Sequence, residues 1–195
     1  MKLHKLIGTA GFGVLLLLAV PVGAEDMEER RAEAQDAAMT LMRALGGELK
    51  QAMQSGGPQA ALSVCTERAP AIAARISRER GMRVTRVSSR YRNALLGMPD
   101  GWEAETLERF RERHEAGEPY KGMSRGERVT EGGRSEYRYM QAIPTEGVCI
   151  ACHGPREQLA PEIRAMLTER YPHDRATGFA VGDLRGAFSV RQPID

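Results

Sequence analysis

The chain has 195 residues, with 28 Lys or Arg and 26 Asp or Glu, which gives a formal net charge of +2. This near balance argues against a nucleic-acid partner, which would favour a concentrated basic face. The length is sufficient for one domain with a hydrophobic core of its own.

Residues 1–24 have the layout of a secretory signal peptide. Two lysines precede an apolar run at 6–20, and small residues follow up to Ala24. We expect cleavage after Ala24, because the run is shorter than the roughly 20 apolar residues of a spanning helix. The mature chain, residues 25–195, is then a single neutral domain with no stable membrane insertion. Such a signal predicts the periplasm; a retained anchor is the alternative.

Two helices are expected first. One spans about residues 25–54, and a break at Ser55–Pro58 separates it from a second helix that ends near Arg80, before Gly81. The apolar positions of the first helix share one face: Ala34, Ala38, Leu41, Leu45, Leu49 and Ala52. Those of the second helix alternate in steps of three and four: Leu62, Cys65, Ala69, Ile72 and Ile76. Cys65 is therefore predicted on the buried face of its helix.

The rest of the chain predicts a small sheet interrupted by helices. The segment 82–90 has the β-branched content of a strand, and Asp100 with Glu103 forms a capping box that opens a helix ending near Gly117. A hairpin is expected at 127–144, with its turn at Gly132-Gly133. A short helix carries CIACH, another begins at Pro161, and a last strand covers GAFSVRQ. Helices followed by an antiparallel sheet indicate an α+β fold.

The segment CIACH, residues 149–153, is a C-x-x-C-H motif, the attachment site of c-type haem. Cysteines three positions apart on a helical turn can each form a thioether with one vinyl group. The next residue, His153, can then bind the iron. The sequence therefore predicts one covalent haem c, held by Cys149 and Cys152, with His153 as an axial ligand.

Two other interpretations of this motif are weaker. A thioredoxin-like redox pair usually opens a helix after a core strand, in a βαβ context that is missing here. A zinc site would need a second pair of ligands, and one spare cysteine does not complete the usual spacing.

The second axial position has several candidates. His114 is near a helix end, His173 is in a predicted loop, and Met98 and Met140 are the methionines nearest to plausible pocket elements. Each has a simpler structural explanation. Cys65 is predicted to be buried without a disulfide partner. It is either an iron ligand or a small apolar residue in a helix interface.

Four segments together resemble one family. They are SVCTERAP at 63–70, RYRNALLGMPDGWE at 90–103, YMQAIPTEGVCIACHG at 139–154 and YPHDRATGFAVGDLRGAFSV at 171–190. The family comprises periplasmic proteins and sensory domains with a PAS-like fold and a covalent c-type haem.

The resemblance implies a PAS-like antiparallel sheet with long N-terminal helices. It also implies cysteine–histidine axial ligation, with Cys65 and His153 in the two positions. One departure is the stretch Ala94–Met98, where the family tends to have an Asn- and Pro-containing turn. Arginines often bind haem propionates, and four lie in or beside the family-like segments, although a solvated surface arginine is the stronger interpretation of each: Arg90, Arg92, Arg138 and Arg185.

The functional expectation is a periplasmic monohaem cytochrome for electron transfer or redox sensing. We expect it to act with an unidentified redox or signalling protein and not to be an enzyme. One alternative is a gas-binding haem sensor that signals to a separate protein. Another is a haem enzyme of sulfur-compound oxidation, although no residues stand out as its acid or base.

Overall fold

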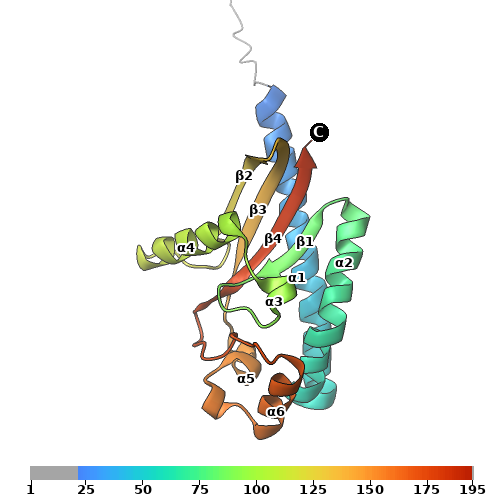
Figure 1. Cartoon of the computed structure of the whole chain (residues 1–195), viewed down its shortest axis with the longest axis vertical. Helices are drawn as coiled ribbons and strands as arrows, with labels where there is room; N and C mark the ends of the chain where they lie inside the picture. Colours follow the sequence, from blue (N-terminus) through green and yellow to red (C-terminus); the bar gives the residue numbers. More distant parts are fainter. Residues whose placement is uncertain (1–21, 195) are drawn as a thin grey trace, which may run out of the picture.

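The structure, a computed structural model, describes residues 22–194 (Figure 1). The apolar run of the predicted signal peptide lies outside the described residues. Within 22–194, no helix combines the length and the apolar character needed to cross a membrane. The helical elements are α1 (Val22–Ser63), the π-helix η1 (Val64–Arg68), α2 (Ala69–Arg80), α3 (Ala94–Gly97), α4 (Gly101–Glu115), η2 (Gly147–Cys149), α5 (Ile150–His153), η3 (Arg156–Gln158) and α6 (Pro161–Arg170). The strands are β1 (Arg83–Val87), β2 (Ser124–Glu131), β3 (Arg134–Pro144) and β4 (Leu184–Ile194).

The four strands form one antiparallel sheet in the order β1-β4-β3-β2. Helices α1 and α2 cover one face of the sheet, and α4 packs on the other. The segment from η2 to α6 lies beyond the end of the strands (Figure 1). The expected α+β fold, an antiparallel sheet with long N-terminal helices, is confirmed.

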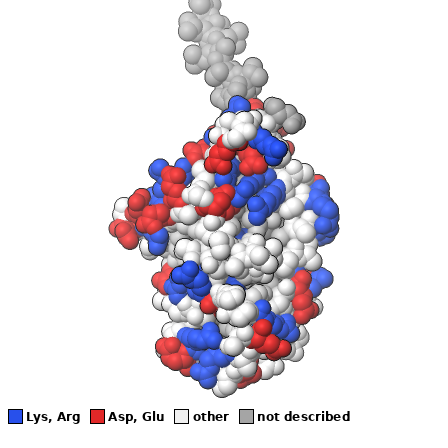
Figure 2. Space-filling view, viewed as in Figure 1, with Lys and Arg blue, Asp and Glu red and all other residues white. Residues whose placement is uncertain are grey.

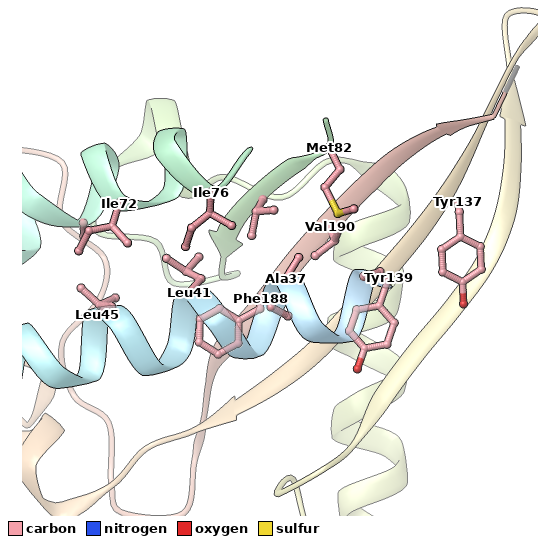
Figure 3. Packing of buried hydrophobic residues seen from close by; sticks show 14 of the residues in the cluster. Ala37, Leu41, Leu45, Ile72, Ile76, Met82, Tyr137, Tyr139, Phe188 and Val190 are labelled. Carbon is pink, nitrogen blue, oxygen red and sulfur yellow. The ribbon is translucent and has the colours of Figure 1, made fainter. Parts of the chain in front are cut away.

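The main core lies between the sheet and α1 and α2. Alternate residues of each strand face this layer, as the pleat requires. Tyr137 and Tyr139 on β3 and Phe188 and Val190 on β4 point toward the helices (Figure 3). Leu41 on α1 is fully buried against them. Burying side chains of this size contributes about 1.5–3 kcal/mol each, so this layer is the main support of the fold.

The opposite face of the sheet carries a buried ionic network. Arg138 alternates with the tyrosines and donates a hydrogen bond to Asp100 at 2.6 Å. Glu103, which is buried, accepts hydrogen bonds from Ser189 at 2.7 Å and Arg191 at 3.3 Å. The predicted capping box of α4 is present, because Asp100 and Glu103 each accept the backbone N–H of the other. The capping residues therefore also fasten α4 to the sheet.

The predicted break between the first two helices is a kink. Helix α1 continues through the Ser55–Pro58 segment, and only Gly57 leaves helical geometry, with φ 65° and ψ −160°. These angles are accessible almost exclusively to glycine. Pro58 follows at a position where its missing N–H costs nothing. The kink lies within the predicted break, and the first helical part extends only two residues beyond the expected end at residue 54.

Two features were not predicted. The second helix is interrupted by the π-helical turn η1, which contains Cys65. Helix α3 lies in the Ala94–Met98 stretch, and the side chain of Asn93 caps it by accepting the N–H groups of Leu95 and Leu96. Other local predictions are confirmed: Gly81 ends α2 in the left-handed conformation, and Gly132 and Gly133 form the hairpin turn with positive φ.

Candidate cofactor site

A cavity of about 510 Å³ opens between α1, η1, β1 and the segment that carries the C-x-x-C-H motif. This volume is in the range of about 300–1,000 Å³ that is typical of small-molecule and cofactor sites. Its wall is mostly apolar and includes Leu45 and Phe188 from the main core. The cavity is lined by residues from two segments far apart in the chain: Cys65 from η1, and Cys149, Cys152 and His153 from the C-x-x-C-H motif.

Cys65 reaches this cavity from the π-helical turn. The helical pattern predicts a buried face, and the structure places Cys65 half-buried at the cavity wall. Single π turns inside α-helices are rare and are frequent at functional sites. Arg86 and Tyr171 lie within electrostatic range of its thiol. The π turn is therefore the local feature that distinguishes Cys65 from an ordinary residue of a helix interface.

Cys149 and Cys152 occupy one short helical turn. Cys149 ends η2, and Cys152 and His153 belong to α5. Because Cys152 and His153 follow Cys149 by three and four residues, the three side chains lie on one face of the turn. All three cysteines of the chain are free thiols. Burial raises the pKa of the Cys152 thiol. This geometry can present two sulfur atoms and an imidazole to a single planar group in the cavity.

The imidazole of His153 is fixed by a backbone carbonyl. Its Nδ1 lies 2.7 Å from the carbonyl oxygen of Ala176, so Nδ1–H donates and Nε2 keeps a free lone pair. Burial lowers the His153 pKa well below its usual value, and the nearby Arg185 and Arg92 guanidiniums lower it further. A neutral imidazole with a fixed tautomer is the form that binds a metal.

The loop at 171–180 builds the surroundings of this histidine. Phe179 donates its N–H to the carbonyl of His153 at 2.9 Å, and its ring meets the imidazole edge-on. Arg92 donates to the carbonyls of Cys152, at 2.5 Å, and Ala176, at 3.1 Å. Asp174 lies 3.3 Å from Arg92 and accepts the N–H of Ala176. The family-like segment at 171–190 therefore holds the histidine in place.

The cavity also has a basic wall. Four arginines line it: Arg83 and Arg86 from β1, Arg92 from the loop before α3, and Arg185 from β4. Burial, followed by repulsion from Arg92 and Arg86, lowers the pKa of Arg185 to about 9. Desolvation by the surrounding protein also lowers the pKa of Arg86, which lines the cavity and keeps an exposed side chain there. The site is therefore strongly electropositive and suited to an anionic ligand.

The other predicted axial candidates lie elsewhere. His114 is exposed and stacks on Tyr120 with ring centroids 4.0 Å apart, and His173 is exposed in its loop. Met98 is 54% exposed outside the cavity lining, and Met140 is buried on the α4 side of the sheet. Met42 and Met53, which the sequence did not single out, do line the cavity.

The arginines that the sequence singled out divide in the same way. Arg92 and Arg185 line the cavity, whereas Arg90 packs on Phe179 and Arg138 belongs to the network on the opposite face of the sheet. Arg86 was missed. It follows Val84 by two residues on β1 and therefore shares its face, and this spacing is the signal that could have placed it on the helix-covered side.

Within residues 22–194, no group of three or more His, Cys, Asp or Glu side chains is arranged to hold a bare metal ion. A second pocket, of about 400 Å³, is lined by residues of α1, α4 and β2, half of which are arginines. Several of these arginines pair with glutamates, such as Arg113 with Glu118. The ligand-type residues gather at the larger cavity.

Comparisons with known proteins agree with the sequence resemblance. A search of curated proteins finds no match. Among solved structures, the crystal structure of the cyanobacterial heme-protein Tll0287 has the same fold, with a TM-score of 0.61 and 24% identity over 88% of this chain and 96% of that chain. The family model described as Tll0287-like matches residues 24–193. The predicted family resemblance is confirmed, and the chain belongs to the Tll0287-like family.

Proposed function

We propose that this protein is a periplasmic monohaem c-type cytochrome that transfers single electrons or reports redox state. The observation that carries the proposal is the meeting of Cys149, Cys152, His153 and Cys65 at one cavity of about 510 Å³. The heme-protein of the same fold supports it. The residues fit the group, since the motif supplies two sulfurs and a neutral imidazole, and the cavity wall is apolar and positively charged.

The four residues would have three roles. Cys149 and Cys152 would hold haem c by thioether bonds, and His153 would bind the iron through Nε2. Cys65 would bind on the other side as a thiolate. Haem c, when bound, supplies a ferric–ferrous couple that exchanges one electron. The anionic sulfur stabilises the ferric state, so we expect a low potential compared with histidine–methionine cytochromes.

The protein's own residues fix the geometry and the surroundings of the site. The carbonyl of Ala176 fixes the tautomer of His153, and the core residues around the cavity exclude water. If His153 and Cys65 both bind the iron as proposed, no position at the iron would be left for a substrate. We therefore propose that the protein is not an enzyme.

A partner protein must receive the electron or the signal. On the face seen in Figure 2, basic and acidic residues are mixed above and below an uncharged middle region. A mixed surface gives little long-range steering toward a partner of one charge. We propose that recognition uses short-range contacts.

The ligation is tested by electron paramagnetic resonance of the ferric protein, produced in cells that mature c-type haem. We expect a low-spin thiolate signal that disappears in Cys65→Ala and persists in Met42→Leu and Met53→Leu, the matched changes on the same cavity wall. An unchanged spectrum in Cys65→Ala would reduce Cys65 to a packing residue. A CO complex of the ferrous wild type would favour gas sensing, and turnover of thiosulfate would favour an enzyme.

Attachment and export are tested separately. A haem-stained denaturing gel should show one covalent haem, lost in the double variant Cys149→Ser/Cys152→Ser. The mature protein should be recovered in the periplasmic fraction with Glu25 as its first residue. A chain that retains residues 1–24 in the membrane fraction would support the retained anchor instead.

A further inference from the structure

Of the four arginines that line the cavity, only Arg92 forms an ion pair with a carboxylate of residues 22–194. Arg83 is exposed at the start of β1. Arg92 is neutralised by Asp174, whose side chain is only 2% exposed. Neither Arg86 nor Arg185 forms an ion pair with any carboxylate of residues 22–194, the described part of the chain. Arg185 reaches the carbonyl of Arg90 at 3.5 Å and lies over the ring of Phe179. Most of their N–H donors therefore remain free to bind a ligand.

The positions of the two residues follow from the sheet. Arg86 is opposite Phe188 in the β1–β4 register and shares a strand face with Val84, two residues earlier, so it projects from the helix-covered face into the cavity. Arg185 precedes Gly186, whose added Cβ would lie 2.3 Å from the carbonyl oxygen of Val87. This close approach of β4 to β1 brings the Arg185 backbone near the strand that carries Arg86.

Two uncompensated guanidiniums in an enclosed site are costly. Burial disfavours their charged form, and their mutual repulsion adds to the cost, as the lowered pKa of Arg185, about 9, indicates. Buried charges are normally paired. A ligand with two carboxylates would supply the missing charge, and the planar fork of each guanidinium can bind a carboxylate through two parallel hydrogen bonds.

We propose that Arg86 and Arg185 bind the two propionate carboxylates of the haem and thereby fix its orientation in the cavity. The inference rests on the proposed function and extends it, because it assigns the anionic end of the cofactor to strands β1 and β4. The thioether cysteines and His153 come from η2 and α5. The cofactor would thus join the sheet to the segment beyond its end.

The test is resonance Raman spectroscopy of the holoprotein, which contains a propionate bending band that is sensitive to hydrogen bonds at the carboxylates. We expect this band to shift to lower frequency in Arg86→Gln and in Arg185→Gln. The control is Arg134→Gln, an exposed residue at the start of β3, which should leave the band unchanged. If a glutamine variant does not fold, the same band is measured in Arg86→Lys and Arg185→Lys. They should shift the band in the same direction, because an ammonium cannot reproduce the fork.

An unchanged band in all four variants, with covalent haem present by gel staining, would overturn the proposal and leave the proposed function intact. A wild-type protein without haem after maturation would overturn both. A shift in only one of the two positions would overturn the paired arrangement, since each arginine is assigned its own carboxylate.

Discussion

Asp174 offers the sharpest test of how the loop at 171–180 holds the histidine. Asp174→Asn keeps the acceptor for the Ala176 N–H but removes the negative charge that neutralises Arg92. Both side chains are at least nine-tenths buried. Removing one partner of a buried pair costs about 3–5 kcal/mol, because the other charge is left uncompensated. We expect the lower end, because the facing atoms, Arg92 Nε and Asp174 Oδ2, form no well-aligned hydrogen bond.

Thermal unfolding of the ferric holoprotein measures this cost. About 3 kcal/mol corresponds to a fall of roughly 6–12 °C in Tm for a domain of this size. His173→Gln, the exposed neighbour, should stay within about 0.5 kcal/mol of wild type. A double-mutant cycle with Arg92→Met should give a coupling energy of at least about 1 kcal/mol. Strict additivity in the cycle, or a cost below about 1 kcal/mol for Asp174→Asn, would refute the argument.

The remaining predictions concern the long helix and the opposite face of the sheet. Gly57→Ala should destabilise by about 1–3 kcal/mol because of its backbone angles, whereas Gly47→Ala in the same helix should stabilise by about 0.5–1 kcal/mol, since its added Cβ meets no atom within 4 Å. Chemical denaturation measures both, and equal signs would contradict the kink assignment. Burial alone would raise the pKa of Asp100, but the Glu103 N–H and the Arg138 and Arg191 guanidiniums hold it below its usual value. A folded pKa below the unfolded value gives stability that is present above about pH 4 and lost on further acidification. Asp100→Asn should therefore flatten that part of the stability–pH curve, and an unchanged slope would count against the assignment.

Local sequence signals predicted the elements that depend on neighbouring residues. The capping box at Asp100, the stop at Gly81 and the turn at Gly132-Gly133 each depend on contacts within four residues. The C-x-x-C-H motif is similar, because its spacing alone places two sulfurs and an imidazole on one helical turn. The alternation along β3 is local too, and it puts Tyr137 and Tyr139 on one face of the sheet.

Features set by tertiary packing could not be predicted in this way. The π turn at Cys65 has no sequence signature, whereas the break that two glycines and a proline indicate is present as the kink at Gly57. The carbonyl that fixes His153 belongs to Ala176, whose side chain carries no chemical signal. Predicting that Arg86 lines the cavity requires knowledge of which face of β1 meets the cavity.

The distance in sequence between the residues at the cavity has a mechanical consequence. On the proposed ligation, the bonds at Cys65 and Cys149 join two points of the chain and close a loop of about 85 residues through the cofactor. A cross-link of that length restricts the unfolded chain by roughly 4–5 kcal/mol in the loop-entropy description of disulfides. Unlike a disulfide, one of its ends is a coordination bond that can open while the other stays covalent. The axial cysteine would then act as a releasable staple between the N-terminal helices and the haem-binding segment, and the oxidation state of the iron would govern how firmly the two are held together.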